Sequence, residues 1–369
     1  MSLLFSPISL RGMTLPNRIV ISPMCQYSAD AGQATDWHLM HLGKFAISGA
    51  AMVIVEATGV TMEGRITPQC LALCNDEQEA ALGRVLRFCR THGQARMAIQ
   101  LAHAGRKGST RRPWDARAPL TAANGGWVTQ APSALPFHPA GEAPHAMTAE
   151  DLAEVKSAFV AATRRALRLG FDAIEVHGAH GYLLHEFLSP LTNLRQDEYG
   201  QTRDNRLRYP LEVFQAMRAA WPAERPMGIR LSAVDWAEGG LSLEDTLHNA
   251  AAFKAAGADW IDVSSGGLVP HQNIPVGPGY QVPFRTCAPG HWRHHHGRGA
   301  DHTGRAGRRH PGARSGRPHR HCPGRLAQPA LGLACRRHSG DPHSARPPIP
   351  ARGLITFPTF PCKQEGVPA

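Results

Sequence analysis

From the amino-acid sequence we expect an α/β protein: an incomplete TIM (β/α)8 barrel of about six strand–helix units, followed by a disordered tail. Three observations lead to this expectation. Short apolar runs recur along residues 1–284, segments with helix signals separate them, and the composition changes abruptly after Phe284. We therefore divide the chain into a barrel domain, residues 1–284, and a tail, residues 285–369.

Six short runs have the character of buried parallel strands. Each run is almost entirely apolar rather than alternating, which is typical of a strand that is covered on both faces. The six runs are residues 19–23, 51–57, 97–102, 172–177, 227–231 and 260–264. A doubly wound open sheet is the alternative, but no glycine fingerprint follows the first run, and this favours the barrel.

Two of the segments between the runs carry signals for both helix ends. Thr148 and Ser242 each precede an aspartate by three residues, and Gly170 and Gly257 follow the corresponding helical stretches. A hydroxyl side chain with an acid in the first turn is typical of a helix start, and glycine is typical of a helix end. We expect helices that begin after these two hydroxyl residues and end at these two glycines.

The charge is divided unevenly between the two parts of the chain. The whole sequence has a net charge of +11, but residues 285–369 alone contain 15 basic and 3 acidic residues, a net charge of +12. Residues 1–284 therefore carry a net charge of −1. The tail has only 9 Leu, Ile, Val and Phe residues, too few for a hydrophobic core. A neutral barrel domain argues against a protein that binds a specific nucleic acid.

The sequence gives no indication of a membrane or secretory location. Its longest strongly apolar run, residues 51–57, is far shorter than the ~20 residues of a membrane-spanning helix. The N-terminus lacks the basic and apolar regions of a secretory signal. The four cysteines of the barrel domain, Cys25, Cys70, Cys74 and Cys89, form no complete zinc-ligand pattern. We expect a cytoplasmic protein with reduced thiols and no metal site.

Polar side chains gather where the predicted strands end, and in a barrel this rim carries the chemistry. The clearest local pattern is the pair His177 and His180, followed by Tyr182. Two imidazole N–H groups can hold one carbonyl or phenolate oxygen, and a tyrosine can donate a proton. The same histidine spacing also occurs in metal sites, and a purely structural loop is a third interpretation.

These residues belong to a longer stretch that resembles a known family. Residues 177–210 (HGAHGYLLHEFLSPLTNLRQDEYGQTRDNRLRYP) resemble the central signature of the old yellow enzyme family of FMN-dependent ene-reductases. Residues 16–20 (PNRIV) and 22–27 (SPMCQY) resemble the first strand of that family. Cys25 and Tyr27 are similar to the bacterial, cysteine-containing subclass that is often called thermophilic-like. The resemblance covers about residues 4–284.

The resemblance implies an FMN site at the rim. Gln100 would hydrogen-bond the polar pyrimidine edge of the flavin, because an amide offers both a donor and an acceptor. Arg230 would place a positive charge where reduction of the flavin builds negative charge. Cys25 would adjust the potential of the flavin and its affinity for substrate. The implied cofactor-binding residues are Ser22, Pro23, Met24, Cys25, Ala57, Gln100 and Arg230.

The resemblance also implies a ping-pong reaction. NADPH or NADH would reduce the flavin, and the C=C bond of an α,β-unsaturated carbonyl compound would then be reduced. His177 and His180 would hold the carbonyl oxygen, and Tyr182 would supply a proton. The implied substrate-binding residues are Tyr27, His177, His180 and Tyr182, and the catalytic residues are Tyr182, His177, His180 and Cys25. Partners would be a small activated alkene and further copies of the chain.

The tail departs from the family pattern, which implies two more strands and a flavin-phosphate site after Phe284. Reading the possible codons one base later turns residues 291–303 into a peptide that contains Val-Gly-Leu-Ile-Thr. The same offset over residues 317–323, 326–337 and 347–351 permits peptides that look like the family's eighth strand, final helix and C-terminal arm. We infer that the tail is out-of-frame translation. Strands one and six would then have open edges, and FMN would bind poorly.

Three alternatives remain open at this point. The chain is an inactive product of a frameshifted ene-reductase gene, or a related flavin barrel of the dienoyl-CoA reductase type that also carries an iron–sulfur cluster. The second alternative needs a cluster of cysteines after the barrel, and the spacing of the tail cysteines does not supply one. The third alternative, from another class, is a basic nucleic-acid-binding protein, which the charge distribution argues against.

Overall fold

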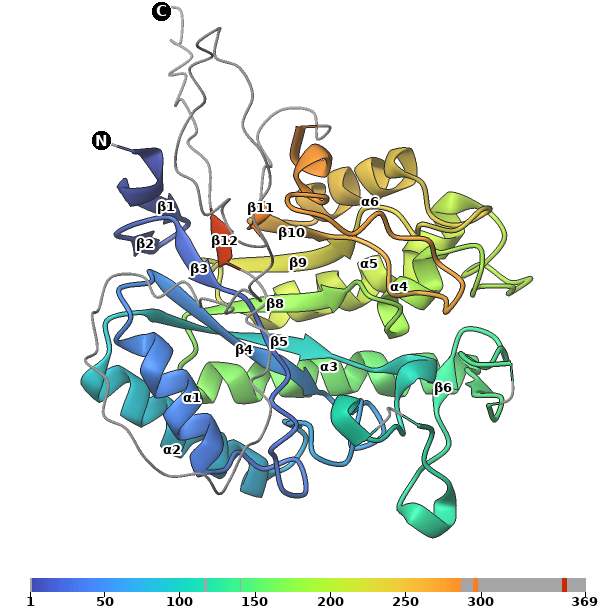
Figure 1. The fold of residues 1–369 in the computed structure, drawn as a ribbon, viewed down its shortest axis with the longest axis horizontal. Coiled ribbons are helices and arrows are strands. Elements are labelled where there is room, and N and C mark those ends of the chain that lie inside the picture. The colour runs from blue at the N-terminus through green and yellow to red at the C-terminus, as the bar shows by residue number, and fades with distance from the viewer. Residues whose placement is uncertain (1, 116–117, 140, 287–294, 298–353, 357–369) are drawn as a thin grey trace, which may run out of the picture.

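The structure, a computed structural model, describes residues 2–115, 118–139, 141–286, 295–297 and 354–356. Its centre is a curled sheet of parallel strands (Figure 1). These strands are β3 (Ile19–Ile21), β4 (Met52–Gly59), β5 (Arg96–Ala102), β8 (Ala173–Gly178), β9 (Met227–Ser232) and β10 (Trp260–Ser264). Each lies on one of the six predicted runs, and each one after β3 pairs in parallel with the one before it. The predicted TIM-barrel class is confirmed.

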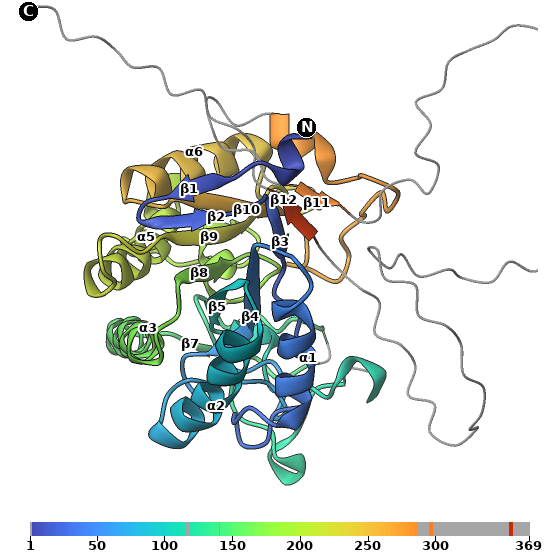
Figure 2. The same cartoon turned by 90° about the vertical axis from the view of Figure 1, so that its left-hand side faces the viewer.

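Helices lie along the outside of the curled sheet (Figures 1 and 2). They are α1 (Asp36–Ala46), α2 (Asp76–His92), α3 (Ala149–Leu169), α4 (Leu183–Leu188), α5 (Arg203–Ala220) and α6 (Leu243–Ala255). The largest apolar core joins strand residues such as Ile99 and Val176 to helix residues such as Phe159 and Phe214. The strands are therefore covered on their outer face, as their apolar sequences predict.

The two predicted helices have their expected starts in the structure, and α3 also has its expected end at Gly170, whereas α6 ends at Ala255 with Ala256 as its C-cap, just before the expected Gly257. The Thr148 hydroxyl accepts a hydrogen bond from the backbone of Asp151 at the start of α3, and the Asp151 side chain binds back to Thr148. Gly170 ends this helix with φ of +83°, a left-handed conformation that favours glycine. Ser242 and Asp245 cap α6 in the same way.

The amino-terminal end of the barrel interior is closed by an apolar plug. A hairpin of β1 (Ile8–Leu10) and β2 (Met13–Leu15) packs its buried residues against Met52, Ala173 and Trp260. Gly228 on β9 makes room for the large Trp260 ring, because a Cβ atom at Gly228 would lie 2.1 Å from the indole. The barrel interior is therefore apolar and closed to water at this end.

The remaining elements are short. The connection between β5 and α3 holds β6 (Gln130–Ala131) and β7 (His145–Ala146), which pair with each other. The 3-10 helices are η1 (Leu3–Phe5), η2 (Gly105–Lys107), η3 (Pro113–Asp115), η4 (Ala122–Asn124) and η5 (Val282–Thr286). Within the described part of the chain, no helix is both long and apolar enough to cross a membrane.

Part of the tail corrects two of our expectations. The short strands β11 (His295–Gly297) and β12 (Leu354–Thr356) pair with each other, and β12 also pairs antiparallel with β3. The expected open edge at the first barrel strand, and a tail without any regular structure, are therefore wrong. The physical reason is that an edge strand offers backbone groups that can pair with almost any extended segment. Apart from residues 285 and 286, which end η5, the rest of the predicted tail lies outside the described residues.

Candidate active site

Polar residues from neighbouring strands lie side by side inside the sheet. Strand register pairs Gln100 of β5 with Glu175 of β8, and Arg230 of β9 with both His177 of β8 and Asp262 of β10. Side chains two residues apart on a strand share a face, so Glu175 and His177 point to the same side. All five side chains are buried. The structure thus brings together the predicted residues Gln100, His177 and Arg230.

The inner part of this group is joined by specific contacts. Gln100 Nε2 donates to Glu175 Oε1 at 2.8 Å, and Trp260 Nε1 donates to Glu175 Oε2 at 3.1 Å. Arg230 Nε lies 3.2 Å from Asp262 Oδ2. Burial, and then the nearby Asp262 carboxylate, raise the pKa of Glu175, whereas Arg230 opposes this shift. Two acids and one guanidinium therefore form a compact polar layer above the apolar plug.

His177, His180 and Tyr182 converge at the end of β8. The imidazole of His177 lies between the other two rings, 5.2 Å from the centroid of His180 and 5.0 Å from that of Tyr182. Both contacts are edge-to-face. Tyr182 is only 9% exposed. The structure therefore groups the three residues of the predicted motif around one small space.

His177 is held in its neutral form. Burial, and then the positive charge of Arg230, lower the pKa of His177 well below its usual value. The backbone N–H of Ala179 donates to His177 Nδ1 at 3.4 Å, so the ring proton lies on Nε2. His177 is therefore a neutral single donor at neutral pH, and its Nε2–H can support negative charge on an oxygen without giving up a proton.

The loop that carries His180 is fixed from three sides. His180 has φ of +61°, a left-handed conformation that costs energy for a residue other than glycine. Its backbone N–H donates to Ser232 Oγ at 3.0 Å, and its Nε2 lies 2.6 Å from Ser264 Oγ. Lys107 Nζ donates to the carbonyl oxygens of His180 and Gly267, at 2.7 and 2.5 Å. These contacts from β9, β10 and η2 hold the unusual conformation.

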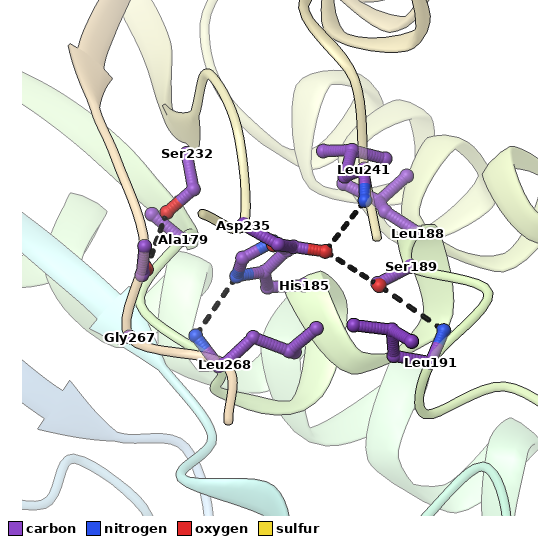
Figure 3. Close-up of polar contacts among 12 residues, drawn as sticks. Ala179, His185, Leu188, Ser189, Leu191, Ser232, Asp235, Leu241, Gly267 and Leu268 are labelled. Atoms are coloured by element: carbon purple, nitrogen blue, oxygen red, sulfur yellow. Dashed lines mark hydrogen bonds and ion pairs between the residues drawn. The ribbon is translucent and has the colours of Figure 1, made fainter. Parts of the chain in front are cut away.

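A buried contact between a histidine and an aspartate supports the same loop from the side of α4 (Figure 3). His185 Nε2 lies 2.9 Å from Asp235 Oδ1, and His185 Nδ1 accepts a hydrogen bond from the backbone N–H of Gly181 at 2.8 Å. Asp235 Oδ2 also accepts from Ser189 Oγ and from the backbone of Leu241, both at 2.7 Å. The loop between His177 and Tyr182 is therefore also held by buried hydrogen bonds on the side of α4.

The segment after β3 carries five of the predicted residues, Ser22, Pro23, Met24, Cys25 and Tyr27. The backbone N–H of Gln26 donates to Glu56 Oε2 at 2.7 Å, which ties this segment to β4. Cys25 and Tyr27 pack, partly buried, against a small apolar cluster that contains Tyr182. Residues from the first and fourth parallel strands, far apart in sequence, therefore meet at one end of the sheet.

The sequence that forms this arrangement matches a known family. The model of the NADH:flavin oxidoreductase / NADH oxidase family matches residues 3–287, which is most of the chain. The chain belongs to this family. As a member of it, the chain is a flavin-dependent NAD(P)H oxidoreductase, and the resemblance to the old yellow enzyme family is confirmed.

Individual relatives agree with this family. The chain is 45% identical over 295 residues to an NADH:flavin oxidoreductase of Gibberella zeae, covering 75% of this chain and 71% of that protein. It is 46% identical over 288 residues to an NADPH dehydrogenase of Listeria monocytogenes, covering 77% and 79%. Morphinone reductase in complex with tetrahydroNAD has a TM-score of 0.63 at 26% identity, with 79% and 80% covered. An old yellow enzyme homologue of Zymomonas mobilis has a TM-score of 0.61 at 25% identity, with 71% and 73% covered.

The residues present fit the flavin of this oxidoreductase family. Ser22 Oγ is buried and has no hydrogen-bond partner within the described part of the chain. Buried polar atoms are rarely left without a partner, so this hydroxyl suits a ligand atom. Ala57 is a small buried side chain on β4, and the Gln100 amide and the Arg230 guanidinium lie on β5 and β9. Within the described residues, no three His, Cys, Asp or Glu side chains gather as metal ligands.

Sequence reasoning missed several residues of this flavoprotein site. Glu175 and Asp262 lie inside two of the apolar runs, and Lys107 lies on a 3-10 helix after β5. A signal for the first two was present, because each lies two residues from another inward-facing position, His177 or Trp260. For Lys107 the only signal in the sequence was its position soon after the end of a predicted strand.

Proposed function

We propose that the barrel domain, residues 1–284, reduces the C=C bond of α,β-unsaturated carbonyl compounds by a ping-pong mechanism. The observation that carries this proposal is the convergence of His177, His180 and Tyr182 next to Arg230 and Gln100. A flavin bound there would supply the hydride, with NADPH or NADH as its reductant. NADPH is favoured as the reductant because several relatives of similar length are named NADPH dehydrogenase.

The side chains of the chain divide the work around the flavin. Gln100 and Ser22 bind the ring by hydrogen bonds, while Pro23, Met24 and Ala57 shape the seat. Arg230 supplies fixed positive charge, balanced in part by Asp262 at 3.2 Å. Cys25, whose thiol is partly buried, lies in the same segment and adjusts the properties of the ring.

The substrate would be held on the other side of this seat. The neutral His177 and its neighbour His180 donate N–H groups to the carbonyl oxygen and polarise the double bond. Tyr182 holds the proton that the α-carbon receives, and Tyr27 packs near it. A cavity of about 270 Å³ borders Tyr182 and is also lined by Lys107, Trp127 and Phe137, which leaves room for a substituent of the alkene.

The test is a two-stage spectroscopic titration. A chain with a corrected 3′ end is purified and loaded with FMN, then reduced by NADPH without oxygen, and 2-cyclohexenone is added last. We expect the flavin absorption to disappear in the first stage and return in the second. A flavin that is reduced but not reoxidised by the enone would contradict the proposal.

We also propose that residues 285–369 are out-of-frame translation. The composition of the tail supports this, as does the end of the family match at residue 287. The nucleotide sequence of the gene provides the test: codons that forbid the offset peptides, in an uninterrupted frame, would refute the proposal. We call the chain with a corrected 3′ end the frame-restored chain. We infer a cytoplasmic, homo-oligomeric enzyme for that chain.

A further inference from the structure

The side-chain amide of Gln100 has one of its three polar contacts already filled. An amide offers two N–H donors and one carbonyl acceptor. One N–H of Gln100 donates to Glu175 Oε1 at 2.8 Å, and the structure gives its carbonyl oxygen no hydrogen-bond partner within the described residues. The carbonyl oxygen and the second N–H are therefore directed away from Glu175.

Glu175 is itself fixed in place. Its other oxygen accepts a hydrogen bond from Trp260 Nε1 at 3.1 Å, and the side chain of Glu175 is completely buried. Trp260 cannot follow a rotation of the carboxylate, because its ring is packed in the apolar plug against Gly228. Glu175 therefore presents an acceptor to Gln100 in one defined direction.

We propose that Glu175 is a positioning residue for the flavin ring, because it fixes which polar groups the Gln100 amide presents to the flavin. This inference rests on the proposed flavin site. The pyrimidine edge of an isoalloxazine carries an N–H group flanked by carbonyl oxygens, so it needs an acceptor beside a donor. When Glu175 accepts from Gln100, the amide presents its carbonyl oxygen to the flavin N–H and its second N–H to a flavin carbonyl oxygen. With the amide reversed, its donor group would face the flavin N–H, and the hydrogen bond would be lost.

The substitution Glu175→Gln tests this orientation directly. The new amide would use its oxygen to accept from Trp260 and its N–H to donate to Gln100, so the Gln100 amide must turn over. We choose lumiflavin as the probe, in the full 369-residue chain, because this ring has no phosphate and needs no phosphate site. We expect at least about a tenfold loss of lumiflavin affinity, measured by quenching of flavin fluorescence.

A double-mutant cycle separates positioning from a general structural effect. If Glu175 acts through Gln100, then Glu175→Gln changes the affinity of a Gln100→Ala variant less than about twofold. The matched control is Glu186→Gln, another completely buried acid, which lies on α4. We expect this control to leave lumiflavin affinity unchanged. Equal losses with and without Gln100, or no loss at all, would overturn the inference.

A second readout does not depend on flavin binding. In ¹⁵N-labelled protein, the side-chain amide signal of Gln100, assigned by its absence in Gln100→Ala, should move in Glu175→Gln and stay in place in Glu186→Gln. A signal that stays in place in Glu175→Gln overturns the inference. If the wild-type chain does not bind lumiflavin, the proposed flavin site is wrong, and the amide signal still decides the contact.

A milder variant covers the case in which Glu175→Gln does not fold. Trp260→Phe removes one of the two donors that hold Glu175 and keeps a large ring in the plug. We expect a smaller loss of lumiflavin affinity, about two- to fivefold, that disappears when Gln100 is replaced by alanine. The same loss in both backgrounds would overturn the inference. Circular dichroism confirms that each variant is folded.

Discussion

His177 depends on residues that surround it in space rather than in sequence. Its neutral state follows from burial and from Arg230, which lies on the next strand. Gln100, His177 and Arg230 could be predicted because they stand out as polar residues at the ends of apolar runs. Glu175 and Asp262 carried a weaker signal, because only their spacing of two residues from His177 and Trp260 indicates which side of the strand they face.

A prediction for the proposed catalytic acid concerns Tyr182→Phe in the frame-restored chain. Loss of the hydroxyl should slow reoxidation of the reduced flavin by 2-cyclohexenone by about 10²–10⁴-fold, while reduction by NADPH keeps its rate. Stopped-flow absorbance measures the two steps separately. The control is Tyr199→Phe, which lies in the loop before α5. An unchanged rate of enone reduction in Tyr182→Phe would exclude this tyrosine as the proton donor.

A second prediction concerns the buried acid Glu186. One of its oxygens accepts from the backbone of Arg106, and the other has no hydrogen-bond partner within the described residues. Burial, opposed by Arg106, raises the pKa of Glu186 to about 8. The folded state therefore binds this proton more tightly than the unfolded state, where the pKa is about 4.3. Its contribution to stability is complete below the unfolded pKa and is lost as the pH rises through about 8.

Glu186→Gln should remove this dependence, because an amide does not ionise. We expect the Tm of the variant, relative to wild type, to rise by roughly 2–8 °C between pH 5 and pH 9. Thermal unfolding followed by circular dichroism at each pH measures the difference. Glu150→Gln, an exposed acid in the first turn of α3, serves as the control. Parallel pH curves for Glu186→Gln and wild type would show that the expectation is wrong.

At the level of elements, the strands and the capped helices follow closely from the sequence. The apolar runs, Thr148 and Ser242 carry signals that act within a few residues, so they survive without tertiary information. The conformation of the loop from His177 to Tyr182 cannot be predicted in this way. It depends on Ser232, Ser264 and Lys107, which come from three other parts of the chain.

The glycines of that loop give a third prediction. Gly181 has φ of +72°, and a Cβ atom there would lie 2.4 Å from the carbonyl oxygen of Gly267. Gly125 has φ of +79°, but nothing lies within 4 Å of the same added atom. Both alanine variants should pay for the left-handed backbone, about 1–3 kcal/mol, and Gly181→Ala should lose more because of the clash. Urea unfolding compares them, and equal losses would contradict the close packing of the two loops.

For the molecule as a whole, the family match and the charge distribution divide the chain at nearly the same residue. The barrel strands were predictable because each one carries its own apolar signal. The pairing of β12 with β3 was not predictable, because it uses backbone groups that leave no trace in the side-chain pattern. Since β12 runs antiparallel to β3, it does not supply a further parallel strand of the barrel.

The fourth prediction compares FMN binding by two forms of the chain. The frame-restored chain should bind FMN at least about a hundredfold more tightly than the 369-residue chain, because the proposed phosphate site depends on the restored strands. Lumiflavin, which has no phosphate, should bind both forms with affinities within about threefold. Fluorescence titrations provide the measurements. Tight, stoichiometric FMN binding by the 369-residue chain would contradict this prediction.

The antiparallel contact between β12 and β3 has a consequence for handling the protein. Removing the last residues by proteolysis or by a stop codon would strip Leu354–Thr356 from β3 and leave its backbone N–H and C=O groups unpaired. Shortened copies could then satisfy those groups only with water or with one another. A chain that is trimmed to its barrel should therefore self-associate more as its concentration rises.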